Sequence, residues 1–319
     1  MNVPVFDLHC DTALALLGET VNEAGSLKKN FYHIDLERAS RLEAYCQCFA
    51  CYTTPMMQER FGASPVVVFE REIATIQREV EHNKNMIQLA HSMDEVAENR
   101  AAGKMSAVLT IEGPAGFDFD PELLENLRQV GFQISTLGWN EKNSLTGSNV
   151  TGGGLTDRGR EYVREAQRLG MLVDVSHISD EGFWDIMEIT NAPVIATHSN
   201  SRAICAHSRN LTDDMFRAIC QTGGVAGINQ YASFLGEQPT LDTVCDHVFH
   251  FMELDPEGTH IALGGDLDGC SRLAAGFTGI ESYPSLADRL MERGLTQENI
   301  QNIFWNNPFR VLQTVQHNT

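Results

Sequence analysis

The sequence has few basic residues and no long hydrophobic run. Its 319 residues contain 23 Lys and Arg against 43 Asp and Glu, which gives a formal net charge of −20. A chain this acidic repels a phosphate backbone, so we expect no nucleic-acid partner. No run of about 18 apolar residues occurs, and the N-terminus MNVPVFDLHCDTALALLGET lacks the basic and apolar regions of a signal peptide. The sequence therefore predicts a cytoplasmic protein with no membrane partner.

Cysteine is sparse as well, with eight residues in the chain, which favours reduced thiols over a disulfide framework. Three of them, Cys46, Cys48 and Cys51, have the spacing C-x-C-x-x-C. The surrounding segment AYCQCFACY alternates as a strand does and has no Cys or His pair nearby, so packed thiols are a better interpretation than a zinc site. The motif H-E-x-x-H is absent, which excludes the common helical zinc proteases.

Apolar runs rich in β-forming residues, bounded by Gly, Pro or Asp, predict eight strands. They cover residues 3–8, 44–52, 106–111, 132–137, 171–175, 193–197, 224–229 and 260–264. Helical patterns lie between most of them and close the chain, at 65–84, 121–129, 156–169, 179–189, 212–221, 241–254, 284–293 and 296–315. This alternation predicts one (β/α)8 TIM barrel, a single catalytic domain over residues 1–319. A doubly wound parallel sheet is the alternative.

Residue types that bind metals stand at the ends of five predicted strands. In a barrel the C-terminal ends of the strands meet at one mouth, where active sites of this fold are built. The residues are His9 and Asp11, Glu112, His177, His198, and Asp266. Each histidine alone is better interpreted as a hydrogen-bonded core residue. Five such strand ends at one mouth, however, would crowd acids and imidazoles together without an ion to pair them.

The donor set points to the kind of metal. Three histidines and two carboxylates suit zinc better than calcium or magnesium, which prefer oxygen ligands alone. Five ligands exceed the needs of one tetrahedral catalytic zinc, so we predict two Zn²⁺ ions that share Glu112 as a bridge. His9 and Asp11 complete the shell of one ion, and His177 and His198 that of the other.

Seven motifs together resemble the membrane (renal) dipeptidase family over essentially the whole chain. They are FDLHCDT, TIEG, DVSH, ATHSNSRAICAHSRNLTDD, GGDLDG, INQYASFL and NNPFRVL. The resemblance implies a (β/α)8 barrel with two zinc ions and the same ligand assignments. It also implies that Arg209 binds the substrate carboxylate and that Asp266 is the aspartate of the family's G-S-D-F-D-G motif. Family members are often dimers, so we expect a homodimer by analogy.

Gly265 and Leu267 replace the Ser and Phe of the family's G-S-D-F-D-G motif, and one further departure bears on the substrate. Where renal-type dipeptidases have a His that helps to hold the scissile carbonyl, this chain has Trp139, followed by Asn140. An indole N–H donates one hydrogen bond but cannot become cationic, so stabilisation of the oxyanion would be weaker or come from another group. We expect Trp139 and Asn140 to contact the substrate.

The predicted function is a metallo-dipeptidase that acts on short peptides, including dipeptides with a D-residue at the C-terminal position. A hydroxide that bridges the two ions would attack the scissile carbonyl. Asp266 would take the proton of the water molecule and pass it to the leaving amine. One alternative is an amidohydrolase-like enzyme acting on another small amide or ester, although Asp11 and Glu112 replace that group's usual H-x-H and bridging lysine. Another is a barrel that binds small ligands without catalysis.

Overall fold

The structure, a computed structural model, describes residues 2–18 and 26–317. Parallel strands form a ring in the order β7-β6-β5-β4-β2-β1-β9-β8, and a parallel bridge between Ala196 and Ala226 joins its two ends. The strands are β1 (Pro4–Cys10), β2 (Ala44–Tyr52), β3 (Ile87–Leu89), β4 (Met105–Glu112), β5 (Phe132–Thr136), β6 (Leu172–Asp174), β7 (Val194–Ile195), β8 (Ala226–Ile228) and β9 (Ile261–Leu263). The predicted barrel is confirmed.

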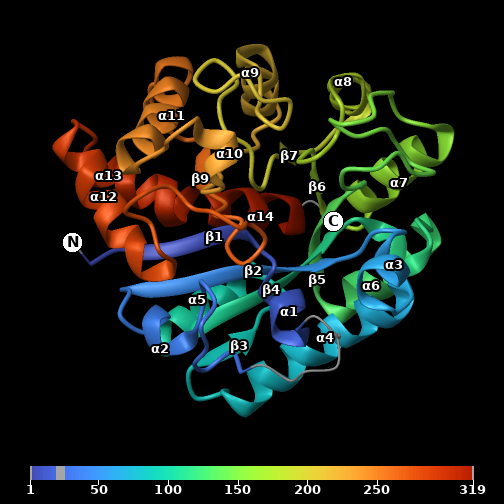
Figure 1. The fold of residues 1–319 in the computed structure, drawn as a ribbon, viewed down its shortest axis with the longest axis horizontal. Helices are drawn as coiled ribbons and strands as arrows, with labels where there is room; N and C mark the ends of the chain where they lie inside the picture. The colour runs from blue at the N-terminus through green and yellow to red at the C-terminus, as the bar shows by residue number, and fades with distance from the viewer. Residues whose placement is uncertain (1, 19–25, 318–319) are drawn as a thin grey trace.

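Helices surround this ring (Figure 1). They are α1 (Thr12–Leu17), α2 (Leu36–Ala39), α3 (Met57–Phe61), α4 (Pro65–His82), α5 (Met93–Ala101), α6 (Leu124–Val130), α7 (Asp157–Arg168), α8 (Asp180–Ile189), α9 (Asp213–Gln221), α10 (Ala232–Leu235), α11 (Leu241–Leu254), α12 (Tyr283–Glu292), α13 (Gln297–Gln301) and α14 (Asn307–His317). Ser64, Thr156, Ser179 and Thr212 begin α4, α7, α8 and α9, because each hydroxyl accepts a hydrogen bond from the N–H three residues further on. Among the described residues, no helix has the length and apolar content needed to cross a bilayer.

The eight predicted strands are all present, but two predictions need correction. The sequence analysis missed β3, a three-residue strand that pairs with the start of β4 outside the ring. The predicted helix at 296–315 is not continuous: α13 and α14 are separated by a π-helical turn at Asn302–Asn306. Pro308 has no N–H to donate to the preceding turn, so a regular helix cannot pass through it. The side chain of Asn307 instead donates to the carbonyls of Gly258 and Ile261, 2.7 and 2.8 Å away.

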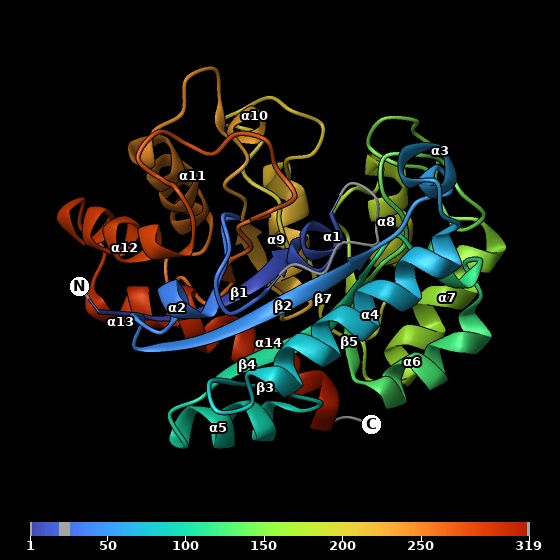
Figure 2. The same ribbon diagram turned by 60° about the horizontal axis from the view of Figure 1, so that its bottom comes forward.

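The interior of the barrel is apolar and is closed at one end by α14. Inward-facing side chains of the strands form one cluster with residues of the C-terminal segment, including Trp305, Val311, Leu312 and Val315. In Figure 2, α14 lies below the strands, and α1, α3 and α10 lie at the opposite end. The N-terminal end of the barrel is therefore filled, and the C-terminal ends of the strands are left as the mouth.

We predict that Leu312→Ala destabilises the protein strongly. Leu312 is fully buried in the barrel cluster, and a cavity there should lower the free energy of unfolding by about 2–5 kcal/mol, measured by urea denaturation. The matched control is Leu123→Ala, because Leu123 is 38% exposed; its effect should stay below about 1 kcal/mol. Equal losses in the two variants would contradict the assignment of α14 as the barrel's closing element.

Candidate metal centre and active site

An irregularity in β1 directs His9 into the mouth. The pairing of β1 with β2 shifts register between Asp7 and Cys10. Leu8 and Cys10 would face the same side of a regular strand, yet Leu8 packs inside the barrel and Cys10 packs between the sheet and the helices. The bulge therefore turns His9 inward. Asp11 was predicted at the end of the first strand, but it lies beyond β1 as the N-cap of α1.

Regular alternation places Glu112 in the mouth. Val108 faces the barrel interior, whereas Leu109 and Ile111 pack on the helix side, so Glu112 at the end of β4 faces inward. Tyr52 is its register partner on β2.

Glu112 lies at the centre of a buried cluster. Its Oε2 is 3.4 Å from Nε2 of His9, and its Oε1 is 2.9 Å from Nε2 of His177 and 3.8 Å from Nε2 of His198. Asp11 Oδ2 lies 3.5 Å from the same nitrogen of His9. The structure thus brings together the five residues that the sequence analysis proposed as metal ligands.

Hydrogen bonds determine which nitrogen of each histidine faces the cluster. Nδ1 of His177 donates to Oδ1 of Asn140 at 3.0 Å. The hydroxyl of Thr197 donates its one proton to Asp174 and therefore accepts from Nδ1 of His198, 2.7 Å away. With Nδ1 protonated in both rings, Nε2 of His177 and of His198 each carries a lone pair, the form in which imidazole binds a metal.

The residues present fit a metal. The Nε2 atoms of His177 and His198 are 3.0 Å apart with no proton to share between them. Nε2 of His9 is buried and has no hydrogen-bond partner among the described residues. The structure contains two groups in which all potential ligand atoms lie within 4.8 Å of one another. One group is His9, Glu112 and His198, and the other is His9, Asp11 and Asp266. A divalent cation would satisfy these unpaired atoms.

The electrostatics of the cluster point the same way. Burial raises the pKa of Glu112 to about 8 and that of Asp266 to about 6. Burial acts to lower the pKa of His9, but the neighbouring carboxylates outweigh it and raise that pKa. Burial, with the positive charges of His9 and Arg209, lowers the pKa of both His177 and His198. The raised pKa values of Glu112 and Asp266 mean that their ionised forms are poorly stabilised by the protein alone, and a bound cation would stabilise them.

Two buried aspartates hold neighbouring strand ends together beneath and behind the cluster. Asp174, the last residue of β6, accepts hydrogen bonds of 2.9 Å from the backbone N–H groups of Ser176 and Thr197. Asp7 of β1 accepts hydrogen bonds of 3.0 Å from an N–H of β1 itself and from one on the segment after β9. These contacts fix the spacing of the strand ends that carry the histidines. Sequence reasoning assigned neither aspartate.

Asp266 reaches the cluster from the loop after β9. Its Oδ1 lies 4.0 Å from Nε2 of His9, and its Oδ2 accepts a hydrogen bond of 3.0 Å from the side chain of Asn229. Asp266, Asp268 and His177 all have positive φ, at 55°, 69° and 70°, which is uncommon for residues other than glycine and is found at functional sites. Sequence reasoning missed Asn229, although it is the second residue of the quoted run INQYASFL and directly follows Ile228, the last residue of β8.

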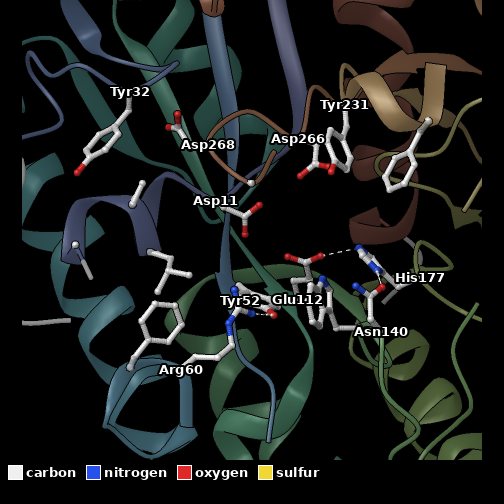
Figure 3. A pocket seen from close by; sticks show the side chains of 17 residues that line it. Asp11, Tyr32, Tyr52, Arg60, Glu112, Asn140, His177, Tyr231, Asp266 and Asp268 are labelled. Carbon is white, nitrogen blue, oxygen red and sulfur yellow. Dashed lines mark hydrogen bonds and ion pairs between the residues drawn. The ribbon is translucent and has the colours of Figure 1, made fainter. Parts of the chain in front are cut away.

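A cavity of about 640 Å³ opens over the cluster (Figure 3). Its floor includes Asp11, Glu112, His177 and Asp266. Its walls include Tyr32, Tyr52, Arg60, Phe61, Trp139, Asn140, Tyr231, Phe234 and Asp268. Trp139 and Asn140, expected at the substrate, therefore face the cavity, and Asn140 also holds His177.

Arg209 is placed differently from Trp139 and Asn140. It is buried behind the wall, with its guanidinium carbon 5.2 Å from the ring of Phe234. Its Nη1 donates to the hydroxyl of Ser199 at 3.3 Å and its Nη2 to the carbonyl of His198 at 3.5 Å, whereas Nε is buried with no partner among the described residues. The guanidinium of Arg209 therefore has an N–H group available for a further hydrogen bond, and it lies behind Phe234, a residue of the cavity wall.

The cysteines do not form a second metal site. Cys46 and Cys48 face the barrel interior, and Cys51 faces the helices. All eight cysteines of the chain are free, which agrees with packed, reduced thiols.

Residues 1–319 match the sequence profile described as membrane dipeptidase, peptidase family M19. The chain belongs to the membrane dipeptidase family. An uncharacterized dipeptidase of Schizosaccharomyces pombe is 33% identical over 219 residues, which are 66% of this chain and 54% of that protein. The dipeptidase tcpJ of Claviceps purpurea is 29% identical over 301 residues, 89% of this chain and 69% of that protein. The chain thus spans about half the length of the first of these relatives.

The fold is shared with a solved metallopeptidase of Rhodobacter sphaeroides, liganded with a phosphinate mimic of the dipeptide L-Ala-D-Ala. The TM-score is 0.86 at 24% identity, and the match covers 98% of this chain and 99% of that chain.

We predict that Gly269→Ala reduces metal binding. A Cβ at this position would lie 2.0 Å from Oδ2 of Asp11 and 2.5 Å from Oδ1 of Asp266, so one carboxylate must move away from the cluster. The bound metal per chain, measured by atomic emission, should fall well below that of the wild type. Gly62→Ala is the control, because no described atom beyond its chain neighbours lies within 4 Å of a Cβ at this position, while its φ of +68° makes the alanine backbone strained. Unchanged metal content in Gly269→Ala would show that these carboxylates do not hold the ion.

Proposed function

We propose that this protein is a zinc-dependent dipeptidase and that residues 1–319 form its single catalytic domain. The observation that carries the proposal is the convergence of the Nε2 lone pairs of His177 and His198, the buried Nε2 of His9 and several carboxylates on one point beneath an open cavity. Borderline metals such as zinc prefer this mixture of imidazole and carboxylate donors. A homodimer and a cytoplasmic location stay predictions from the sequence.

The proposed assignment uses two ions. His9, Asp11 and Glu112 would hold one, and Glu112, His177 and His198 the other. Glu112 is suited to the shared position because its two oxygens face different histidines, Oε2 toward His9 and Oε1 toward His177. When bound, the ions would activate a water molecule and polarise the scissile carbonyl.

Asp266 is the proposed proton carrier. Its Oδ2 is held by Asn229, which leaves Oδ1 turned toward the cluster, 4.0 Å from His9 Nε2. Oδ1 would take the proton of the attacking water and give it to the leaving amine, a transfer that requires a carboxylate fixed within reach of both.

Arg209 is the proposed partner of the substrate's C-terminal carboxylate. Its Nε is unpaired, and its two described side-chain hydrogen bonds are long. A carboxylate would pair with this buried fork in a geometry that lysine does not offer. Trp139 and Asn140 would contact the substrate from the cavity wall. The ligand of the Rhodobacter protein mimics a dipeptide with a C-terminal D-residue, and we extend the proposed range to such dipeptides.

The metal requirement is testable directly. Purified protein should contain about two zinc ions per chain and hydrolyse members of a panel of L,L, L,D and Gly-containing dipeptides. Treatment with a chelator should abolish hydrolysis, and added zinc should restore it. Full activity after chelation, or hydrolysis of a lactone or cyclic amide in place of every dipeptide, would contradict the proposal.

We predict that Asp266→Asn lowers kcat by about 100-fold or more, because an amide cannot accept the proton. Its zinc content should match that of the wild type. The control is Asp246→Asn, since Asp246 pairs with Arg293 at the surface, and that variant should keep its full rate. Retained turnover in Asp266→Asn would remove this residue from the proton transfer, and loss of zinc would make it a ligand.

A further inference from the structure

One cation lines an otherwise acidic cavity. Asp11, Glu112, Asp266 and Asp268 bring four carboxyl groups to it, and Arg60 is the sole lysine or arginine among the described lining residues. Arg60 is exposed and lies at the end of α3, on the segment between β2 and α4. The proposed chemistry gives this residue no role.

Aromatic rings hold the guanidinium of Arg60 in place. Its central carbon lies 5.3 Å from the ring centre of Phe61, 5.6 Å from that of Trp139 and 6.0 Å from that of Tyr52. Nη1 donates a hydrogen bond of 2.9 Å to the hydroxyl of Tyr52. No carboxylate within residues 2–18 and 26–317 pairs with Arg60 at salt-bridge distance; its described polar partner is this hydroxyl. The charge is therefore oriented by rings that themselves line the cavity.

Trp139 contributes the largest of these ring faces. Tryptophan is the aromatic residue that attracts a cation most strongly. Trp139 also packs edge-on against Tyr52, with ring centres 5.2 Å apart. The residue that replaces the family's histidine thus helps to position Arg60.

Arg60 and Arg209 lie on opposite sides of the cluster, Arg60 in the cavity wall and Arg209 buried behind it. Figure 3 shows Arg60 and Tyr231 on different sides of Glu112. The ring of Tyr231 lies 4.8 Å from that of Phe234, and the guanidinium carbon of Arg209 lies 5.2 Å from the ring of Phe234, which places Arg209 on the Tyr231 side of the cluster. A dipeptide held at Arg209 by its C-terminal carboxylate and crossing the cluster therefore directs its N-terminal residue toward Arg60.

We propose that Arg60 selects dipeptides whose N-terminal residue carries a side-chain carboxylate, Glu-X or Asp-X. The proposed metal ions would offset the carboxylates of the cavity floor, so an anionic side chain that enters the cavity needs a separate cation on the wall to pair with it. Arg60 supplies that cation with N–H groups already oriented, so little side-chain entropy is lost on binding. This inference rests on the proposed dipeptidase function and names the substrate class of that same site.

The test compares Glu-Ala with Gln-Ala, which have the same shape but differ in charge. The wild type should show a kcat/KM about tenfold or more higher for Glu-Ala. Arg60→Met, which keeps the apolar stem, should abolish this preference mainly through KM and leave Gln-Ala within about twofold. Arg60→Lys should keep part of the preference. The control is Arg168→Met, since Arg168 pairs with Glu165 within α7 and should not alter selectivity.

Three results would overturn the inference. An equal fall of kcat for both substrates in Arg60→Met would place Arg60 at the scissile bond. A preference of the wild type for Ala-Glu over Ala-Gln that depends on Arg60 would place the anion at the other end of the dipeptide. The absence of any preference between Glu-Ala and Gln-Ala would remove the role altogether. Thermal unfolding of each variant checks that the fold is kept.

A binding measurement separates this inference from the proposed function. Calorimetry with zinc-loaded Asp266→Asn should show tighter binding of Glu-Ala than of Gln-Ala, and Asp266→Asn combined with Arg60→Met should bind both equally. A wild type that hydrolyses no dipeptide contradicts the proposed function, whereas the calorimetric difference still reports on Arg60. Equal binding of Glu-Ala and Gln-Ala to Asp266→Asn contradicts the inference even where hydrolysis is observed.

Discussion

The crowding of buried carboxylates and imidazoles at the mouth of the barrel is the constraint on which the site depends. Glu112 contacts three histidines, and the lone pairs of His177 and His198 face each other without a proton between them. Such an arrangement is unfavourable on its own, because buried polar atoms without partners cost about 1–3 kcal/mol each. A cation turns the same contacts into ligand bonds. The unpaired atoms lower the stability of the folded protein, and a bound metal would restore it. Metal binding and folding are therefore linked.

The barrel tolerates this cluster because the rest of its length is well packed. The apolar interior is filled by strand side chains and by α14, and the buried aspartates Asp7 and Asp174 tie neighbouring strand ends together. The bulge in β1 and the positive φ of His177 and Asp266 are local departures from regular geometry, and all three direct a side chain toward the cluster. Strain at the mouth is thus supported by regular packing below it.

Sequence reasoning predicted the barrel and its clustered residues because both follow from local patterns. Alternating strands and helices indicate the ring, and the topology then brings the strand ends together. Contacts between residues far apart in the sequence leave no local pattern that could have predicted them. Asn229 beside Asp266 and the Arg60–Trp139 contact depend on loops whose paths only the fold determines. The bulge at His9 could not be predicted, because the spacing of His9 and Asp11 is equally compatible with a regular strand. The π-helical turn before Pro308 could not be predicted either, because its apolar spacing resembles that of a continuous helix.

The position of α14 has a consequence for how the chain is made. Phe6 and Leu8 of β1 leave the ribosome long before Leu312 and Val315, yet all four are buried in one cluster. During synthesis the inner face of β1 therefore stays uncovered until α14 has been made. Contacts so distant in sequence slow folding and leave apolar surface open to aggregation or to chaperones. The lower end of the barrel, which has no part in the chemistry, thus determines when the mouth above it can first form.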